Sequence, residues 1–417
     1  METPPRTADL VVIGGGIVGA ATAFYAARAG IRSVLIEARP ALCTLTTPVS
    51  TGAFRLQFST EEELRLVEET VAVFQNFAEV TGQAEYDPAI RAQGYLWLTR
   101  SPQRAAEQRE LVARQHGWGV TDIELLDGDE VRRRFPYVAP DVLQARFRAG
   151  DGFIDTRAVT MGFARASGAT VVTGCRAQGF DVSGGRLRGV RTSAGTIETD
   201  RAVIACGPLS GGVAAWAGID LPIETLRRHK LVMPDVPEVP AGAPMTIDED
   251  CGAHWRPALR GAWLLFTDPR TPPSDPTDAV PADPGFAFEL LDPASPTAVA
   301  QTAPFWADVW ERNAAHWMVQ AGQYTMTPDQ RPLIGPTEID GLHVNTGYSG
   351  HGVMGGPAGS ELLASICDAL DVELAEVLST VSQTMQGQGA KSDVTNSVAS
   401  DKVLTNVDQK AIDSRLI

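Results

Sequence analysis

The sequence has few of the residues that staple small extracellular domains or build metal centres. Its five cysteines lie far apart and form no Cys-x-x-Cys pair: Cys43, Cys175, Cys206, Cys251 and Cys367. The six histidines form no His-x-x-x-His pair. An odd, scattered set of cysteines argues against a disulfide framework, and the lack of paired ligands argues against structural zinc. We therefore expect no bound metal and a reduced, cytoplasmic setting.

Positive charge is scarce as well. The chain has 35 Lys and Arg against 51 Asp and Glu, which gives a formal net charge of −16. Nucleic acids and anionic membranes would repel such a chain, so neither is expected as a partner. An anionic substrate is not excluded, because a local arginine pocket can coexist with an acidic surface.

One apolar run, Leu10 to Ala27, has the composition of a signal peptide or a membrane span. Arg6 is the one basic residue before it, which is a poor basic region for a signal peptide. Four glycines interrupt the run: Gly14, Gly15, Gly16 and Gly19. Glycines at this density favour a tight turn over a helix that faces lipid.

These glycines form a Gly-x-Gly-x-x-Gly motif between predicted regular elements. We expect Leu10 to Ile13 to form a buried parallel strand and Ala20 to Ala29 to form a helix. Gly30 would end that helix, and Ile31 to Ile36 would form a second strand. This order predicts a dinucleotide-binding unit of the Rossmann type.

Each glycine of the motif has a physical task. Gly14 permits the turn, Gly16 lets the backbone approach a pyrophosphate, and Gly19 lets the helix pack close to the strand. The start of the helix, with Ile17 and Val18, offers free N–H groups and a positive dipole end to the phosphates.

Glu37 closes the second strand, and Ala38 and Arg39 follow it within the predicted cofactor site. The carboxylate of Glu37 can accept hydrogen bonds from ribose hydroxyls, and it would repel a 2′-phosphate. NADP is therefore disfavoured, whereas the motif alone leaves both FAD and NAD open.

A second glycine-rich segment lies near the other end of the chain. Leu342 to Thr346 is expected to be a strand and Ala358 to Leu370 a helix. Five glycines between them predict a loop: Gly347, Gly350, Gly352, Gly355 and Gly356. Such a loop allows the backbone to come close to a phosphate or a flat ring.

Three blocks together resemble the superfamily of FAD enzymes that includes glycine oxidase, sarcosine oxidase and D-amino acid oxidase. They are Val11 to Glu37, Val203 to Ser210, and Thr327 to Gly359. The resemblance implies an α/β fold of the glutathione reductase-like FAD type, with one FAD extended across the Rossmann-type domain. A second, mixed-sheet domain would cover the isoalloxazine ring and form the substrate pocket.

The resemblance also implies that the two domains alternate along the chain. The expected FAD-binding parts are residues 1–84, 151–220 and 321–384, and the expected substrate-domain parts are residues 85–150 and 221–320. Residues 385–417 are polar and predict a weakly ordered tail.

By the same resemblance, several further residues would surround the flavin. The expected cofactor contacts outside the N-terminal unit are Ser50, Thr51, Gly52, Cys206, Gly207, Arg331, Gly350, His351, Gly352, Val353 and Met354. Where the monomeric sarcosine oxidases have a cysteine bonded to the flavin, this chain has Gly322, so we expect non-covalent FAD. Where those enzymes have a lysine of a carboxylate clamp, this chain has Met354, which argues against a simple sarcosine-like substrate.

Four side chains are candidates for chemistry. His351 can stabilise negative charge on the reduced flavin or, alternatively, hold its loop by hydrogen bonds. Arg55 and Arg256 are candidates for a carboxylate site, and a surface position is the alternative for Arg55. Tyr348 can line the pocket, although aromatic side chains more often serve packing.

Most of the remaining chain is predicted to be structural. Ser59 to Glu62 matches a capping box, and Leu64 to Ala78 follows with the spacing of a core-facing helix. Gly94 to Thr99 predicts a strand and Gln103 to His116 a polar helix. Asp268 to Pro284 is rich in Pro and Asp and predicts a surface loop, with a lid or a contact surface as the alternatives.

The leading hypothesis is an FAD-dependent oxidase or dehydrogenase that oxidises the C–N bond of an amino acid or of a secondary or N-methyl amine. Hydride transfer to flavin N5 would give an imine, which requires positioning and exclusion of water rather than a catalytic triad. The alternatives are an FAD-dependent 2-hydroxy acid oxidoreductase and a flavin-bearing, non-enzymatic assembly protein. The electron acceptor, oxygen or another, is left open.

Overall fold

The computed structural model describes residues 3–268, 271–312 and 315–365. The predicted polar tail at 385–417 lies outside these residues, as does the end of the helix expected at 358–370. Within the described residues, no helix has the length and the apolar character needed to cross a membrane.

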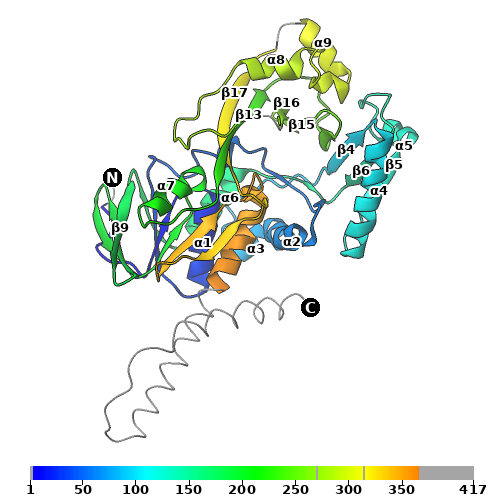
Figure 1. Ribbon diagram of the computed structural model, residues 1–417. Helices are drawn as coiled ribbons and strands as arrows, with labels where there is room; N and C mark the ends of the chain where they lie inside the picture. The colour runs from blue at the N-terminus through cyan, green and yellow to red at the C-terminus, as the bar shows by residue number, and fades with distance from the viewer. Residues whose placement is uncertain (1–2, 269–270, 313–314, 366–417) are drawn as a thin grey trace, which may run out of the picture. The chain divides into compact units, whose positions relative to one another are not determined.

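The first sheet has six strands and draws them from the beginning, the middle and the end of the chain (Figure 1). In spatial order they are β18 (Leu333–Pro336), β19 (Leu342–Thr346), β12 (Ala202–Ile204), β1 (Leu10–Ile13), β2 (Ser33–Glu37) and β8 (Thr170–Thr173). All neighbours pair in parallel except β18 and β19, which are antiparallel. Strands β1 and β19 have the bounds that the sequence predicts.

The strand and helix that flank the first glycine turn follow from their composition. All four residues of β1 are apolar and buried, as expected for an inner strand of a parallel sheet. The helix α1 (Ile17–Arg28) begins earlier than predicted, because the extended backbone of Gly16 already serves as its N-cap. Its small side chains allow close packing against α6 (Thr156–Ala166).

The second sheet has eight strands and is mixed. In spatial order they are β17 (Met318–Met326), β13 (Glu224–Met233), β16 (Gly261–Phe266), β15 (Ala253–Ala258), β14 (Met245–Asp248), β4 (Tyr95–Thr99), β6 (Gln144–Arg148) and β5 (Glu124–Asp127). Strands β14 and β4 pair in parallel, and the other pairs are antiparallel. The predicted α/β fold with a second, mixed sheet is thus confirmed.

Two small sheets complete the strands of the described residues. Strands β9 (Ala177–Ser183), β10 (Arg186–Thr192) and β11 (Gly195–Glu198) form an antiparallel sheet. Its first hairpin turns at Gly184 and Gly185, and both have positive φ. Strand β3 (Ala53–Phe54) pairs with β7 (Gly152–Phe153).

The other helices lie between these strands. They are α2 (Glu61–Gln75), α3 (Phe77–Thr81), α4 (Pro102–Gly117), α5 (Gly128–Arg134), α7 (Ser210–Ala215), α8 (Gly285–Leu291), α9 (Phe305–Arg312) and a helix at 352–365. Three short 3-10 helices are η1 (Thr47–Val49), η2 (Gly207–Leu209) and η3 (Val299–Gln301).

The capping box of α2 is displaced by one residue from its predicted place. Thr60, not Ser59, is the N-cap, because its backbone is extended and its side-chain oxygen accepts a hydrogen bond from the amide of Glu63. The hydroxyl of Thr60 also lies 2.9 Å from the carboxylate of Glu63. The predicted apolar face ends early, since Ala78 belongs to the separate helix α3 and is exposed.

The C-terminal helix also starts earlier than predicted, at residue 352 instead of Ala358. Gly352, Gly355 and Gly356 are therefore helical and do not belong to the loop. Their small size permits a close approach to α1: a Cβ atom on Gly356 would lie 2.8 Å from Cγ2 of Val18. In Figure 1 this helix, in orange, lies beside α1.

Candidate functional site

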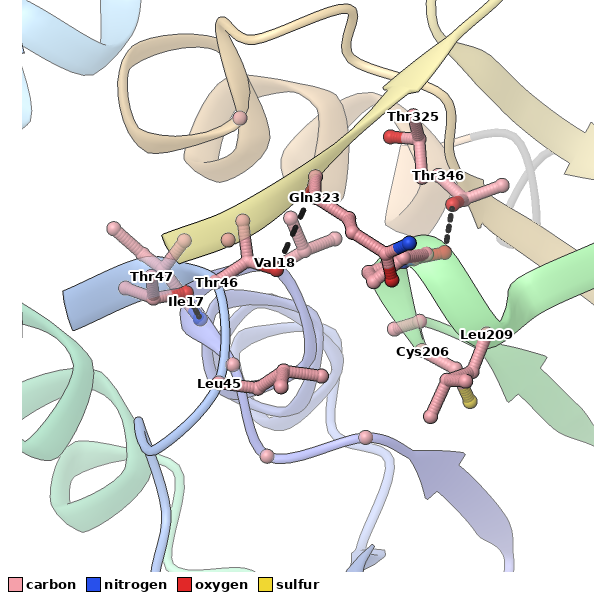
Figure 2. A pocket seen from close by; sticks show the side chains of 18 of the residues that line it. Ile17, Val18, Leu45, Thr46, Thr47, Cys206, Leu209, Gln323, Thr325 and Thr346 are labelled. Atoms are coloured by element: carbon pink, nitrogen blue, oxygen red, sulfur yellow. Dashed lines mark hydrogen bonds between the residues drawn. The ribbon is translucent and has the colours of Figure 1, made fainter. Parts of the chain in front are cut away.

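A cavity of about 410 Å³ opens at the carboxyl ends of β1, β2, β12 and β19. Its walls come from both glycine segments and from the eight-stranded sheet. Figure 2 shows Ile17 and Thr47 on one side of it and Cys206 and Leu209 on another, with Gln323 of β17 above them. The edge where parallel strands end is where open α/β sheets bind their ligands.

Most of the predicted cofactor contacts line this cavity. They are Gly14, Gly16, Ile17, Val18, Glu37, Ala38, Arg39, Ser50, Cys206, Gly207, Gly350, Gly352 and Val353, together with the predicted pocket residue Tyr348. The other predicted site residues are not among its lining residues: Gly19, Thr51, Gly52, Arg55, Arg256, Arg331, His351 and Met354. The structure thus brings the two glycine segments to one cavity and places several of the expected side chains behind its wall.

The first glycine turn fits a dinucleotide. Gly14 has φ +115°, and a Cβ atom there would lie 2.4 Å from the carbonyl oxygen of Ala205. A Cβ atom on Gly19 would lie 1.8 Å from the carbonyl oxygen of Gly14, so the helix could not pack against the turn. At Gly16 the nearest atom is the hydroxyl of Thr47, at 3.3 Å, which leaves the backbone open toward the cavity.

The amino end of α1 is suited to phosphate. Its N-cap, Gly16, supplies no side-chain hydrogen bond, and the first turn holds no acidic residue. The amide of Ile17 lies 3.3 Å from the hydroxyl of Thr47, a long contact that a stronger acceptor can displace. The unsatisfied amides and the helix dipole both favour an anion here.

Glu37 is held in place by two backbone amides. Its Oε2 accepts a hydrogen bond of 2.7 Å from Gly15, and its Oε1 accepts one of 2.8 Å from Arg39. Each carboxylate oxygen retains a lone pair for a further donor. Because Glu37 lines the cavity, the residues present can hold the ribose hydroxyls of a dinucleotide.

The loop predicted at Asp268 to Pro284 has no buried residue in its part described at 271–284, and it also contributes to the cavity. Asp278, in the part described at 271–284, lines the cavity and contacts the dinucleotide unit. Its carbonyl oxygen accepts a hydrogen bond of 2.6 Å from Arg39, and its carboxylate lies 2.8 Å from Arg176. Gln323 anchors the loop, since it bonds the carbonyl of Asp275 and the amide of Thr277. The loop therefore contributes Asp278 to the wall of the cavity.

The hydroxyl of Tyr348 does not face an open pocket. It donates a hydrogen bond to Oδ1 of Asn345, and burial raises the pKa of the phenol. The amide nitrogen of Asn345 lies 3.1 Å from the hydroxyl of Thr22 and 3.0 Å from that of Ser360. These buried groups connect α1, β19 and the helix at 352–365.

His351 lies between a carboxylate and a guanidinium. Its Nδ1 is 3.3 Å from Oε1 of Glu63, and its Nε2 is 3.5 Å from Nη2 of Arg55. Burial lowers the pKa of His351 more than Glu63 raises it, and the charge of Arg55 lowers it further. The imidazole is therefore neutral near pH 7, and this arrangement assigns its proton to Nδ1, facing Glu63.

Arg55 lies among aromatic rings. Its guanidinium carbon is 4.4 Å from the ring centroid of Phe58, 5.6 Å from that of Trp97 and 5.9 Å from that of Tyr95. Its Nη1 is 3.8 Å from Sδ of Met354. Within the described ranges, no carboxylate lies at ion-pair distance from Arg55, so its charge is available to an anion.

Arg228 lines the cavity, although the sequence does not predict it as a site residue. Its Nη1 donates hydrogen bonds to the carbonyl of Asp268, at 3.1 Å, and to the hydroxyl of Thr271, at 2.7 Å. Its guanidinium lies 5.9 Å from the ring of Tyr324, which also lines the cavity. Burial raises the pKa of Tyr324, and the charges of Arg228 and Arg55 oppose that shift. Both arginines thus act on this end of the cavity.

The other two predicted arginines lie elsewhere. Arg256 is 5% exposed, and its donors reach backbone carbonyls: Nε to Thr51 at 2.8 Å and Nη1 to Pro257 at 2.9 Å. The side chain of Arg331 is 56% exposed and lies 3.6 Å from the carboxylate of Glu62. Only long-range strand pairing decides which arginine reaches the cavity, so residue type alone could not separate Arg228 from these two.

Comparison with known proteins agrees with this geometry. Human mitochondrial sarcosine dehydrogenase is 27% identical over 375 residues, which cover 86% of this chain but 39% of that protein. FAD-dependent oxidoreductase domain-containing protein 1 of Xenopus laevis is 24% identical over 413 residues, which cover 88% of this chain and 80% of that one. The chain thus spans about two fifths of the length of sarcosine dehydrogenase.

Solved structures show the same fold. L-proline dehydrogenase from P. horikoshii superposes with a TM-score of 0.77 at 25% identity, covering 87% of this chain and 94% of that one. Glycine oxidase from Geobacillus kaustophilus has a TM-score of 0.73 at 20% identity, covering 88% and 95% of the two chains. The DAO family, described as FAD dependent oxidoreductase, matches residues 9–366. This chain therefore belongs to the DAO family of FAD-dependent oxidoreductases.

Proposed function

We propose that this protein oxidises the C–N bond of an amino acid or of a secondary or N-methyl amine. The observation that carries the proposal is the composition of the cavity. One wall is the dinucleotide cradle, and another is the eight-stranded sheet, which presents Arg228 and Tyr324. Two similar proteins are named as dehydrogenases of sarcosine and of proline, and both of these amino acids have a secondary amine.

FAD, when bound, supplies a ring that accepts a hydride from the carbon next to nitrogen. The task of the chain is to bind and orient the substrate. Arg228 and Arg55 both act on Tyr324 electrostatically, so a substrate carboxylate near this tyrosine meets two positive charges. That pairing would fix one end of an amino acid and leave its amine free.

The surroundings of Arg55 strengthen such a pairing. Phe58 and Tyr95 are buried beside it, and Trp97 is partly buried. Apolar neighbours exclude water, and an ion pair is stronger where water is excluded. His351 is neutral and lies between Glu63 and Arg55, so we assign it the task of orienting the guanidinium without competing for the anion.

Anaerobic reduction of the purified flavoprotein tests this proposal. The panel pairs amines with 2-hydroxy acids of the same carbon skeleton, for example N-methylalanine and alanine with lactate. We expect the visible flavin absorbance to fall with at least one amine and to persist with its hydroxy acid. Bleaching by a hydroxy acid alone would overturn the C–N assignment. Bleaching by dithionite but by no member of the panel would favour a non-enzymatic role.

The same experiment identifies the electron acceptor. After reduction by the amine, air is admitted and the return of the flavin absorbance is timed. A return within a turnover time indicates an oxidase, and a slow return indicates a dehydrogenase that needs another acceptor.

A further inference from the structure

Lys230 is the only lysine before residue 391 in this sequence. It lies in β13 and is 1% exposed. Its Nζ donates hydrogen bonds of 3.1 Å each to the carbonyl oxygens of Pro48 and Ser50. All other cationic side chains of the described residues are arginines or histidines, so Lys230 is the one side-chain amine among them, and it is buried.

Lys230 and Arg256 share one indole. The ammonium nitrogen of Lys230 lies 3.9 Å from the ring centroid of Trp263, and the guanidinium carbon of Arg256 lies 4.0 Å from it. Arg256 is also 4.3 Å from the ring of Phe153, and its Nε donates to the carbonyl oxygen of Thr51. Cation–π contacts of this length stabilise a desolvated charge but do not neutralise it.

Neither cation is paired with a carboxylate of the described residues. Burial, with a smaller effect of the charges of Arg256 and Arg157, lowers the pKa of Lys230 to about 7. Burial also lowers the pKa of Arg256 to about 9. Two buried charges without a counter-ion cost stability, and apolar side chains of similar length would pack without that cost. The arrangement therefore points to a task other than packing.

Both cations hold the same short segment, residues 47–52. Its carbonyl oxygens at Pro48, Ser50 and Thr51 accept the three hydrogen bonds from the sheet. Its other side faces the cofactor cavity, which Thr47, Val49 and Ser50 line. Thr47 also contacts the first amide of α1, where a phosphate would bind.

Gly52 closes this segment in a conformation that only glycine adopts readily. Its φ is +65°, and a Cβ atom there would lie 2.4 Å from the carbonyl oxygen of Ile154. The segment is thus fixed at its end by backbone packing and along its length by the two cations. It has little freedom to move away from the cavity.

We propose that Lys230 and Arg256 are positioning residues for the flavin, which hold residues 47–52 against the cofactor and whose positive charges favour its reduced form. Reduction adds negative charge to the ring, and fixed positive charge in a region of low dielectric stabilises it. The proposal rests on FAD binding and is independent of the identity of the substrate.

The test is the midpoint potential of the FAD-loaded protein, measured against a reference dye at pH 6.5, which is below the pKa of Lys230. In K230M we expect the reduction equilibrium to become at least about tenfold less favourable, a fall of about 30 mV for a two-electron couple. K230R keeps the charge and should stay within about threefold of the parent protein, about 14 mV. The affinity for FAD should fall in K230M and recover in K230R.

The matched control is R260M. Arg260 lies at the exposed turn of the same sheet, and its side chain is 81% exposed. This variant should keep the parent potential. A folded K230M with the parent potential and the parent FAD affinity would overturn the proposal. If K230M does not fold, the midpoint potentials and FAD affinities of R256M and R256K are compared in the same way. No substrate is needed, so failure here is distinguishable from failure of the proposed amine oxidation.

Discussion

The hydroxyl of Tyr348 donates a hydrogen bond to the side-chain oxygen of Asn345, and both residues are buried. Asn345 in turn bonds Thr22 of the first helix and Ser360 of the helix at 352–365. Residues more than 300 positions apart in sequence are thereby joined at the wall of the cofactor cavity. The network explains how two distant glycine segments keep a fixed spacing.

Tyr348→Phe should destabilise the protein. The substitution leaves the side-chain oxygen of Asn345 without its buried donor, which costs about 1–3 kcal/mol. Denaturant unfolding of the FAD-free protein measures the loss. Tyr86→Phe is the control, because the hydroxyl of Tyr86 has no hydrogen bond to any described residue. Equal stability of the two variants would contradict the role of the network.

Gly16→Ala should separate cofactor binding from folding. Gly16 has a negative φ, and an added Cβ atom meets only the hydroxyl of Thr47, so the chain can fold. The methyl group would occupy the approach of the pyrophosphate and weaken FAD binding by about tenfold or more, at least about 1.4 kcal/mol. Flavin fluorescence quenching measures the affinity for FAD, and circular dichroism shows whether the variant is folded. Gly19→Ala, in contrast, should prevent folding, since its Cβ would lie 1.8 Å from a backbone oxygen.

Arg228→Met should raise KM for a carboxylate-bearing amine by about 10- to 100-fold, the worth of a hydrogen bond to a charged group. Arg55→Met should raise it by less, because Arg55 is not among the residues that line the cavity and acts on a carboxylate there only through its charge. Activity on a matched amine without the carboxylate should change far less. Steady-state kinetics with the two substrates make the comparison. Arg331→Met is the control, since Arg331 is exposed and pairs with Glu62 outside the cavity lining. An equal rise in KM for both substrates would refute carboxylate binding by these arginines.

Lys230 should make stability depend on pH. Its pKa is about 7 in the folded protein against an ordinary value of 10.5. Between pH 7 and pH 10.5, Lys230 is protonated in the unfolded chain and mostly neutral in the folded protein. Its contribution to the free energy of unfolding therefore rises with pH, by up to about 1.4 kcal/mol per pH unit. The positive charges of Arg256 and Arg157, which lie on neighbouring elements, also lower the pKa of Lys230. Urea unfolding at pH 7 and pH 9 should show the parent protein gaining stability relative to K230M; parallel curves would show that Lys230 does not titrate there.

The parts of the fold that the sequence predicts are those set by local pattern. The apolar strand β1 is followed by Gly14, and the buried strand β19 lies between Gly341 and Gly347; both have the predicted limits. The turn between β1 and α1 follows from glycine geometry at Gly14 and Gly19. The starts of two helices are earlier than predicted. Gly16 is the N-cap of α1 and Gly352 is the first residue of the helix at 352–365, because close packing, and not helix propensity, places the helices there.

The parts that the sequence does not predict depend on strand register. Trp263 faces both Val232 and Arg256 across neighbouring strands, and this pairing brings Lys230 and Arg256 to one ring. No local signal specifies such a register. The same holds for the loop at 271–284, whose place at the cavity wall depends on hydrogen bonds with Gln323.

The central claim is that the two glycine segments together hold one FAD. The most direct measurement is the visible spectrum of the purified chain after incubation with FAD and removal of excess, followed by acid precipitation. We predict flavin bands near equimolar occupancy and release of all the FAD into the supernatant, because Gly322 offers no thiol to the ring. A protein that stays colourless would contradict the claim.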